Sequence, residues 1–131
     1  MARVIPLQDA TRLALPGRTS YEIVSAMSGA RGVTLRRVEI PVAALGEPTR
    51  AQHRHADFEE CMYVLSGRGM ASSDGRDVEI GPGDTILVPP NELHATRNIG
   101  DEPLVMLCFF PVADIRAGTA EPRPASGQTP R

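Results

Sequence analysis

Three histidines and one carboxylate have the types and the spacing of a metal site. His53 and His55 are two residues apart in a predicted strand, so both imidazoles project from the same face. Glu60 begins the next predicted strand, and His94 begins another one further along the chain. Three imidazoles and a carboxylate can fill four positions on a divalent first-row transition metal ion and leave one or two open. Open positions are typical of catalytic metal sites, whereas structural sites are closed.

Two segments around these residues match known motifs. The stretch from His53 to Gly67 resembles the first conserved motif of the cupin superfamily, which reads H-x-H, four residues, E, six residues, G. The stretch from Gly83 to Asn98 resembles the second motif, which reads G, five residues, P-x-G-x-x-H, three residues, N. Asn91 stands where the family usually has Gly, and Asn tolerates the left-handed conformation that such a turn requires.

The resemblance implies an all-β fold, the double-stranded β-helix or jelly-roll barrel of the cupins. It also implies that a metal ion lies inside the barrel, bound by His53, His55, Glu60 and His94. Glu59 is the competing carboxylate, but the six-residue count to the motif glycine favours Glu60. Strand alternation would then turn Glu59 outward.

The pattern of the whole chain fits such a barrel. Twelve glycines and twelve prolines indicate many turns and no long helix. Asp74-Gly75 between two short alternating runs predicts a type I′ hairpin. The other predicted strands are Tyr21–Met27, Thr34–Ile40, His53–His55, Glu60–Ser66, Thr85–Val88, Leu93–Asn98 and Leu104–Phe110.

The chain is short enough for one domain. We expect residues 1–30 to form an N-terminal arm or edge strand, residues 31–112 to form the barrel, and residues 113–131 to be a disordered tail. The last predicted strand, Leu104–Phe110, is apolar on both faces. Its outer face needs cover from the N-terminal arm or from a second subunit, so a homodimer is expected.

Composition excludes several classes of partner. A net charge of −2, the lack of a basic run and a total of two Tyr, three Phe and no Trp argue against a nucleic-acid-binding protein. No run of apolar residues is long enough to predict a membrane span. Cys61 and Cys108 are isolated and suggest no disulfide framework, which favours the cytoplasm.

Strand alternation also predicts part of a substrate pocket. If Glu60 points inward, Met62 does too, and Thr96 follows His94 in the same way. Arg36 shares a face with apolar residues. It is either an inward clamp for a substrate carboxylate or an exposed residue at the strand end.

The expected function is an enzyme that acts on a small organic molecule bound to the metal. Such an ion polarises a carbonyl or enol oxygen and stabilises an enolate. Iron with an open position would suit an Fe(II)-type dioxygenase, which is the first choice of reaction. Mn, Ni, Zn or Cu fit the same ligands, and isomerase, cyclase, decarboxylase or lyase chemistry would then use Glu60 as the catalytic proton carrier. The alternative from another class is a non-catalytic cupin that binds a small ligand.

Overall fold

The computed structural model describes residues 1–44 and 52–120, and nearly all of its regular structure is β. Three short 3-10 helices are present in these residues: η1 (Leu7–Asp9), η2 (Ala26–Ser28) and η3 (Arg116–Gly118). The strands are β1 (Thr11–Leu15), β2 (Arg18–Val24), β3 (Thr34–Ile40), β4 (Arg54–His55), β5 (Glu60–Ser66), β6 (Gly69–Ser73), β7 (Arg76–Ile80), β8 (Thr85–Val88), β9 (His94–Asn98), β10 (Leu104–Phe110) and β11 (Thr119–Ala120).

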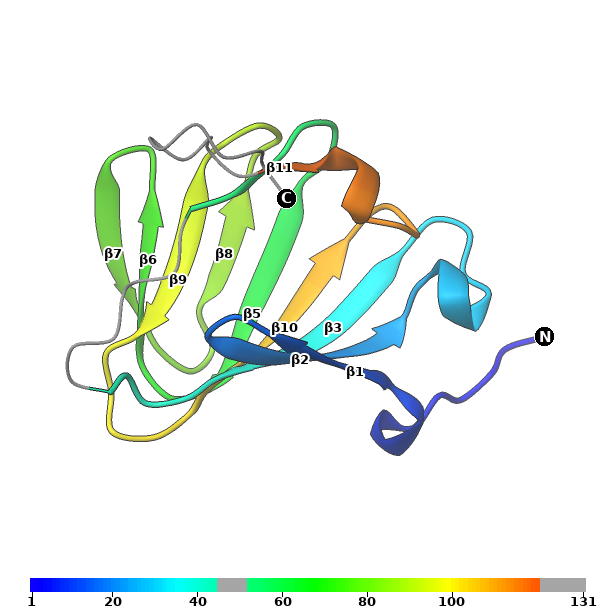
Figure 1. Cartoon of the computed structure of the whole chain (residues 1–131), viewed down its shortest axis with the longest axis horizontal. Coiled ribbons are helices and arrows are strands. Elements are labelled where there is room, and N and C mark those ends of the chain that lie inside the picture. The colour runs from blue at the N-terminus through cyan, green and yellow to red at the C-terminus, as the bar shows by residue number, and fades with distance from the viewer. Residues whose placement is uncertain (45–51, 121–131) are drawn as a thin grey trace.

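The strands form one large sheet and two small ones, all with antiparallel pairing. The large sheet has six strands in the order β1-β2-β3-β10-β5-β8, and the small sheets have the orders β7-β6-β9 and β11-β4. A single bridge between His53 and His94 joins the two small sheets. In Figure 1, β7, β6 and β9 lie on the left, and β8, β5, β10 and β3 follow toward the right. This architecture confirms the predicted all-β cupin barrel.

Alternation of side chains along the strands builds the interior. In β5 the residues Glu60, Met62 and Val64 are buried, while Tyr63 and Leu65 are exposed, as the sequence predicts. The core contains aliphatic, sulfur-containing and a few aromatic side chains from both sides of the barrel: Val38, Ile40, Phe58, Met62, Val64, Ile80, Val88, Leu104, Met106, Cys108, Phe110 and Ile115.

Two turns adopt the conformations that their residues favour. Asp74 and Gly75 have φ values of 50° and 74°, which are the positive values that a type I′ hairpin between β6 and β7 needs. Asn91 has a φ of 66° in the turn before β9. The replacement of the motif glycine by Asn therefore preserves the left-handed backbone of this turn.

The N-terminal segment differs from the prediction in its details. The strand predicted at 21–27 begins earlier and ends earlier, at Arg18–Val24. It ends because the Ser25 side chain accepts a hydrogen bond from the Met27 amide and starts η2. β1 and β2 then extend the large sheet beyond β3.

The C-terminal segment contains regular structure up to residue 120. The sequence places residues 113–131 in a disordered tail, but 116–120 form η3 and β11, and β11 pairs with β4. Ile115 is 8% exposed and belongs to the core. The residues that Ile115 and β11 contact lie far away in the sequence, so local composition does not reveal these contacts. Residues 121–131 lie outside the described part of the chain.

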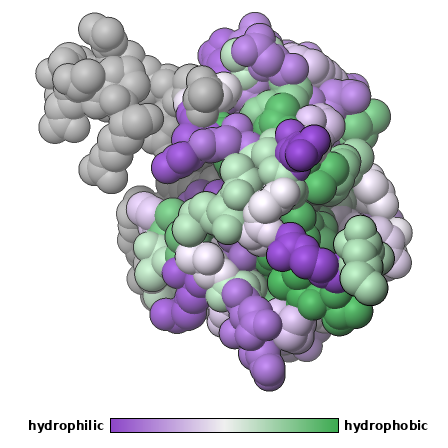
Figure 2. Space-filling model, turned by 90° about the vertical axis from the view of Figure 1, so that its right-hand side faces the viewer, coloured by the Kyte–Doolittle hydropathy of each residue, from purple (hydrophilic) through white to green (hydrophobic). Residues whose placement is uncertain are grey.

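The outer face of the large sheet keeps exposed apolar side chains. Tyr63, Leu87 and Phe109 are 45%, 59% and 39% exposed. β1 and β2 continue the same sheet beyond β3, so these two strands extend its outer face and do not cover β10. Figure 2 shows another view of the surface, in which hydrophobic residues gather toward the right of the molecule. Among the described residues, no helix is long and apolar enough to cross a membrane.

Candidate metal centre

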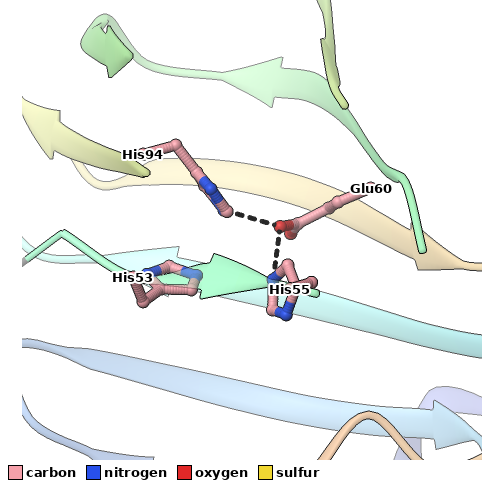
Figure 3. Close-up of side chains that lie close together, drawn as sticks. All are labelled: His53, His55, Glu60 and His94. Atoms are coloured by element: carbon pink, nitrogen blue, oxygen red, sulfur yellow. Dashed lines mark hydrogen bonds and ion pairs between the residues drawn. The ribbon is translucent and has the colours of Figure 1, made fainter. Parts of the chain in front are cut away.

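The four predicted ligands converge at the seam between the sheets. His53 and His55 come from the start of β4, Glu60 begins β5 and His94 begins β9. One ligand atom from each residue lies within 4.8 Å of the ligand atoms of the others. Figure 3 shows the carboxylate of Glu60 pointing between the rings of His94 and His55.

The backbone holds the two halves of this cluster together. The amide of His53 donates to the carbonyl of His94 over 3.0 Å, and the amide of His94 donates to the carbonyl of His53 over 2.9 Å. The amide of Asn91 donates to the carbonyl of His55, so the turn with positive φ also anchors β4. Main-chain hydrogen bonds thus join the first motif, through His53 and His55, to the second motif, through His94 and Asn91.

The cluster is almost completely removed from solvent. Relative exposures are 9% for His53, 3% for His55, 5% for Glu60 and 3% for His94. The His55 ring stacks on Phe58, with 4.9 Å between centroids, and meets the edge of Phe110 at 5.2 Å. Aromatic packing therefore restricts the orientation of His55.

Hydrogen bonds on the far side of two rings fix their tautomers. The Thr119 hydroxyl donates its single proton to the Ile115 carbonyl over 2.6 Å, so it must accept from Nδ1–H of His55 at 2.8 Å. Nδ1 of His94 lies 3.0 Å from the carbonyl of Glu92, which can only accept. Nδ1 of each ring therefore carries a proton, and Nε2 of each ring faces Glu60.

Both Nε2 atoms lie beside the same carboxylate. Oε1 of Glu60 lies 3.1 Å from Nε2 of His55 and 2.9 Å from Nε2 of His94. Burial would raise the pKa of Glu60, but hydrogen bonds and charge from His55 and His94 outweigh it and lower the pKa to about 2. Without a metal ion these hydrogen bonds require a proton on Nε2, because a carboxylate can only accept. A metal ion would take the place of that proton and bind the Nε2 lone pairs and the ionised carboxylate together. The donor set therefore fits a divalent metal ion, which satisfies all of these acceptors at once.

A cavity of about 340 Å³ opens beside the cluster. The predicted pocket residues Met62 and Thr96 both line it and are both buried. Arg36 also lines it and is not an exposed strand end, because its side chain is 15% exposed. Nε and Nη2 of Arg36 donate to one oxygen of Glu22 over 3.0 and 2.8 Å.

The sequence did not identify several residues around the cavity. Arg18 and Ser20 line it from β2, and Ile115, Arg116 and Thr119 line it from the C-terminal segment. The alternating polar residues from Arg18 to Glu22 were the available signal for the first two, because they occupy one face of a strand. The contact of Thr119 with His55 spans 64 residues and leaves no local signal.

A family comparison agrees with this arrangement. The family model described as "Cupin domain" matches residues 37–110, more than half of the chain, and this segment contains all four residues of the cluster. This chain belongs to the cupin family.

Two curated relatives match parts of this cupin. The uncharacterized protein MJ1618 of Methanocaldococcus jannaschii is 45% identical over 56 residues, which cover 43% of this chain and 45% of the relative. A glucose-6-phosphate isomerase of Thermococcus onnurineus is 34% identical over 64 residues, which cover 45% of this chain and 34% of the relative. The cupin spans less than half the length of either relative.

Solved structures share the fold at low sequence identity. The nucleoside dehydratase Pac13 of Streptomyces superposes with a TM-score of 0.76 at 16% identity, covering 93% of this cupin and 92% of Pac13. Oxalate decarboxylase of Lactobacillus farciminis superposes with a TM-score of 0.73 at 21% identity, covering 87% and 34% of the two chains. At these identities the superpositions show the fold alone.

Proposed function

We propose that this cupin is a metal-dependent enzyme that transforms a small metal-chelating organic molecule without oxidising it. The reaction class is isomerisation, elimination or decarboxylation. The observation that carries the proposal is the buried set of three imidazoles and one carboxylate, in which two Nε2 atoms face an ionised carboxylate. Leaving such groups unsatisfied would be costly, whereas one bound cation satisfies them.

His53, His55, Glu60 and His94 would hold one divalent transition metal ion, with Mn, Fe, Ni, Zn and Cu as the candidates. When bound, the ion supplies a Lewis acid that polarises a carbonyl or enol oxygen of the substrate. Thr119 and the Glu92 carbonyl keep Nδ1 of their histidines protonated, which directs Nε2 to the metal. The apolar walls of Met62, Met106 and Phe110 exclude water around the bound molecule.

We propose a different role for Glu60 from the one that the sequence favours. A carboxylate whose pKa is about 2 is a weak base at neutral pH. We therefore assign Glu60 to holding the metal and to offsetting part of its charge, and assign the proton transfer of the reaction to another group or to solvent.

A non-oxidative reaction replaces the dioxygenase as the first choice. Of the four proteins named above, MJ1618 is uncharacterized and the other three are an isomerase, a dehydratase and a decarboxylase; none of these three is named as a dioxygenase. An isomerisation, a dehydration and a decarboxylation each balance without O₂. The dioxygenase expectation has no support among them.

The experiment combines metal analysis with two readouts of turnover. The purified protein is stripped with a chelator and reloaded separately with Mn, Fe, Ni, Zn and Cu. Each form is then incubated in D₂O with a panel of keto and hydroxy acids, while NMR follows deuterium incorporation and product, and an electrode follows O₂. We expect metal-dependent conversion or exchange without O₂ uptake. Substrate-dependent O₂ uptake by the iron form would overturn the non-oxidative proposal.

A second candidate is a metal-bound cupin that binds a ligand without converting it. The observation in its favour is that Glu60 is the one carboxylate among the described residues that line the cavity. Binding of panel members with neither conversion nor deuterium exchange in any metal form would establish this candidate and contradict the enzyme.

We also propose that the protein acts in the cytoplasm as a homodimer paired through the outer face of the large sheet. Exposed Tyr63, Leu87 and Phe109 support the pairing, and the two cysteines, Cys61 and Cys108, which form no disulfide among the described residues, support a reducing compartment. Light scattering after gel filtration should give a dimer mass for the parent and a monomer mass for Phe109→Ser. A monomeric parent would contradict the dimer.

A further inference from the structure

The charge of Arg36 is balanced within the protein. Its Nε and Nη2 donate to one oxygen of Glu22 over 3.0 and 2.8 Å, and the two side chains are mostly buried, with exposures of 15% and 11%. Arg36 also lines the cavity beside the metal cluster. The guanidinium at the cavity therefore belongs to an ion pair without net charge. A ligand carboxylate would compete with Glu22 for this guanidinium, whereas an uncharged ligand group would not.

The ion pair leaves hydrogen-bond donors of Arg36 unused. A guanidinium has five N–H groups, and Glu22 accepts from Nε and Nη2. Within the described part of the chain, Nη1 donates to no residue. It is also not fully buried, because Ser20 Oγ is the one described side-chain N or O atom that is both fully buried and unpartnered. Nη1 therefore has donors for a ligand.

A buried hydroxyl lies near Arg36 on the same face of the sheet. Ser20 is 1% exposed, lines the cavity, and has no hydrogen-bond partner for Oγ among the described residues. Ser20 is opposite Val38 and Glu22 is opposite Arg36, so Ser20 and Arg36 are diagonal neighbours. Such neighbours are about 7–8 Å apart, which is within reach of a long side chain. A polar ligand group that meets Arg36 can therefore also satisfy Oγ, which is costly to leave unpaired.

The other two arginines at the cavity have partners of their own. Arg18 donates to the carbonyl of Pro16 over 3.0 Å and has a further interaction. It is four residues from Glu22 along β2, which is about 13 Å. Arg116 is paired with Asp114 at 2.7 Å, and its side chain is 85% exposed. Neither arginine is therefore assigned to the ligand.

Arg36 is close enough to the metal cluster for one small molecule to reach both. Arg36 is opposite Cys108, Cys108 is opposite Met62, and Met62 is two residues from Glu60. Two strand spacings and two residues separate the Cα atoms of Arg36 and Glu60 by about 12 Å along the sheet. Both side chains line the same cavity, so a molecule of a few carbon atoms can bridge the space between them.

We propose that Arg36 and Ser20 form a hydroxyl subsite, in which they bind an alcohol group of the substrate. This rests on the proposed function, in which oxygen atoms elsewhere in the same molecule chelate the metal. The alcohol oxygen accepts from Nη1 of Arg36, and Ser20, which can donate or accept, completes its hydrogen bonds. The substrate class is a small hydroxylated molecule with a chelating oxygen group and an uncharged far end.

The test uses hydroxamic acids of increasing chain length as probes, because their two oxygens chelate a metal ion. At each length the far end is a methyl, a hydroxyl or a carboxylate group. Isothermal titration on the zinc-loaded protein should show, for at least one length, about tenfold tighter binding of the hydroxyl probe than of the methyl probe. The carboxylate probe of that length should bind no tighter than the hydroxyl probe, because Glu22 already balances Arg36.

Two variants remove the groups of the subsite. Ser20→Ala should reduce the preference for the hydroxyl probe to about threefold or less. The double variant Arg36→Met/Glu22→Leu should abolish the preference, and it leaves no buried charge unpaired. Arg37→Gln is the matched control and should keep the preference, because Arg37 projects from the other face of β3 and is paired with Glu39.

Three results would each overturn the hydroxyl subsite. The first is equal binding of the hydroxyl and methyl probes at every length. The second is tighter binding of the carboxylate probe than of the hydroxyl probe, and the third is an unchanged preference in either variant. Circular dichroism checks the fold, and Ser20→Ala decides if the double variant does not fold.

Zinc content separates this test from that of the proposed function. Ser20→Ala should bind zinc as the parent does, because its Oγ makes no hydrogen bond with the cluster. If zinc binds stoichiometrically and the hydroxyl preference is absent, the hydroxyl subsite alone fails. If the parent binds no zinc, the metal-dependent function fails. Titration of the same probes into the metal-free protein then decides the subsite, which stands if the hydroxyl probe is preferred and fails if it is not.

Discussion

The two walls of the cavity are built in opposite ways. The wall from β4, β5 and β9 has its polar groups connected to each other: the Glu60 carboxylate contacts two rings, and each of these rings has a second partner. Within the described residues, the wall from β2 and β3 contains a buried hydroxyl without a hydrogen-bond partner. The polar groups of the first wall contact each other, whereas this hydroxyl of the second wall contacts none of them. The family match begins at residue 37, so it includes the first wall, while β2 lies before it.

Removing one ligand of the metal wall should give the largest effect. His94→Ala should lower the metal content of the purified protein at least tenfold, because three remaining ligands hold a divalent ion much more weakly. Elemental analysis measures the content, and circular dichroism checks that the barrel is folded. Ser20→Ala on the opposite wall is the control and should keep its metal. Unchanged metal content in His94→Ala would remove this residue from the site.

Lowering the pH should destabilise the fold through the buried carboxylate of Glu60. The pKa of Glu60 is lowered from 4.5 to about 2 in the folded protein, so the unfolded chain binds this proton first as the pH falls. The stabilisation is complete above pH 4.5 and is lost between pH 4.5 and about 2, on the order of 3 kcal/mol. Thermal melts of the metal-free protein across this range should show a steeper loss for the parent than for Glu60→Gln.

Asp114 provides the contrast for this measurement. Its pKa is also lowered to about 2, through hydrogen bonds from Arg116, but the carboxyl is exposed to solvent. Solvent screens such a pair, so Asp114→Asn should leave the pH dependence of melting close to that of the parent. A change as large as that of Glu60→Gln would show that burial is not what distinguishes the two carboxylates.

Substitution of Thr119 should reduce metal affinity less than the loss of His94 does. Thr119→Val removes the hydroxyl that accepts from Nδ1 of His55, and loss of such a partner lowers metal affinity by about tenfold. Thr119→Ser keeps the hydroxyl and should restore the affinity, measured by competition with a chromophoric chelator. Equal affinities for the Val and Ser variants would show that the hydroxyl does not orient the ring.

Substitution of Asn91, in the turn before β9, should give the smallest effect, which is a change in the stability of the fold. Asn91→Ala places a residue that disfavours positive φ in a left-handed position and should destabilise the fold by about 1 kcal/mol. Asn91→Gly should be close to neutral. Urea denaturation measures both, and equal stability of the Ala and Gly variants would contradict the role of the backbone conformation.

The same contrast explains what could be predicted from the sequence. The metal wall depends on histidines in fixed positions within two local motifs, and strand alternation then places Met62 and Thr96 in the cavity. Both signals come from residues that are close together in the sequence, so they can be recognised without knowledge of the fold. Strand limits such as Thr34–Ile40 and Leu104–Phe110 were predicted for the same reason.

The remaining features depend on contacts between distant segments. Glu22 holds Arg36 only because β2 pairs with β3, and Thr119 reaches His55 only because β11 pairs with β4. Polar residues such as Arg18 and Ser20 look like an exposed strand until the cavity beside them is known. Ser25 caps η2, so β2 ends at Val24. The sequence predicted a strand up to Met27 because apolar residues follow Ser25.

The reciprocal backbone pair between His53 and His94 has a consequence for the motions of the barrel. It is the single bridge between the two small sheets among the described residues, and it lies within the candidate metal cluster. A metal held by β4, β5 and β9 would act as a cross-link at the place where those sheets are least connected. The amides of His53 and His94 should therefore exchange with deuterated solvent much more slowly in the metal-loaded protein than in the stripped one.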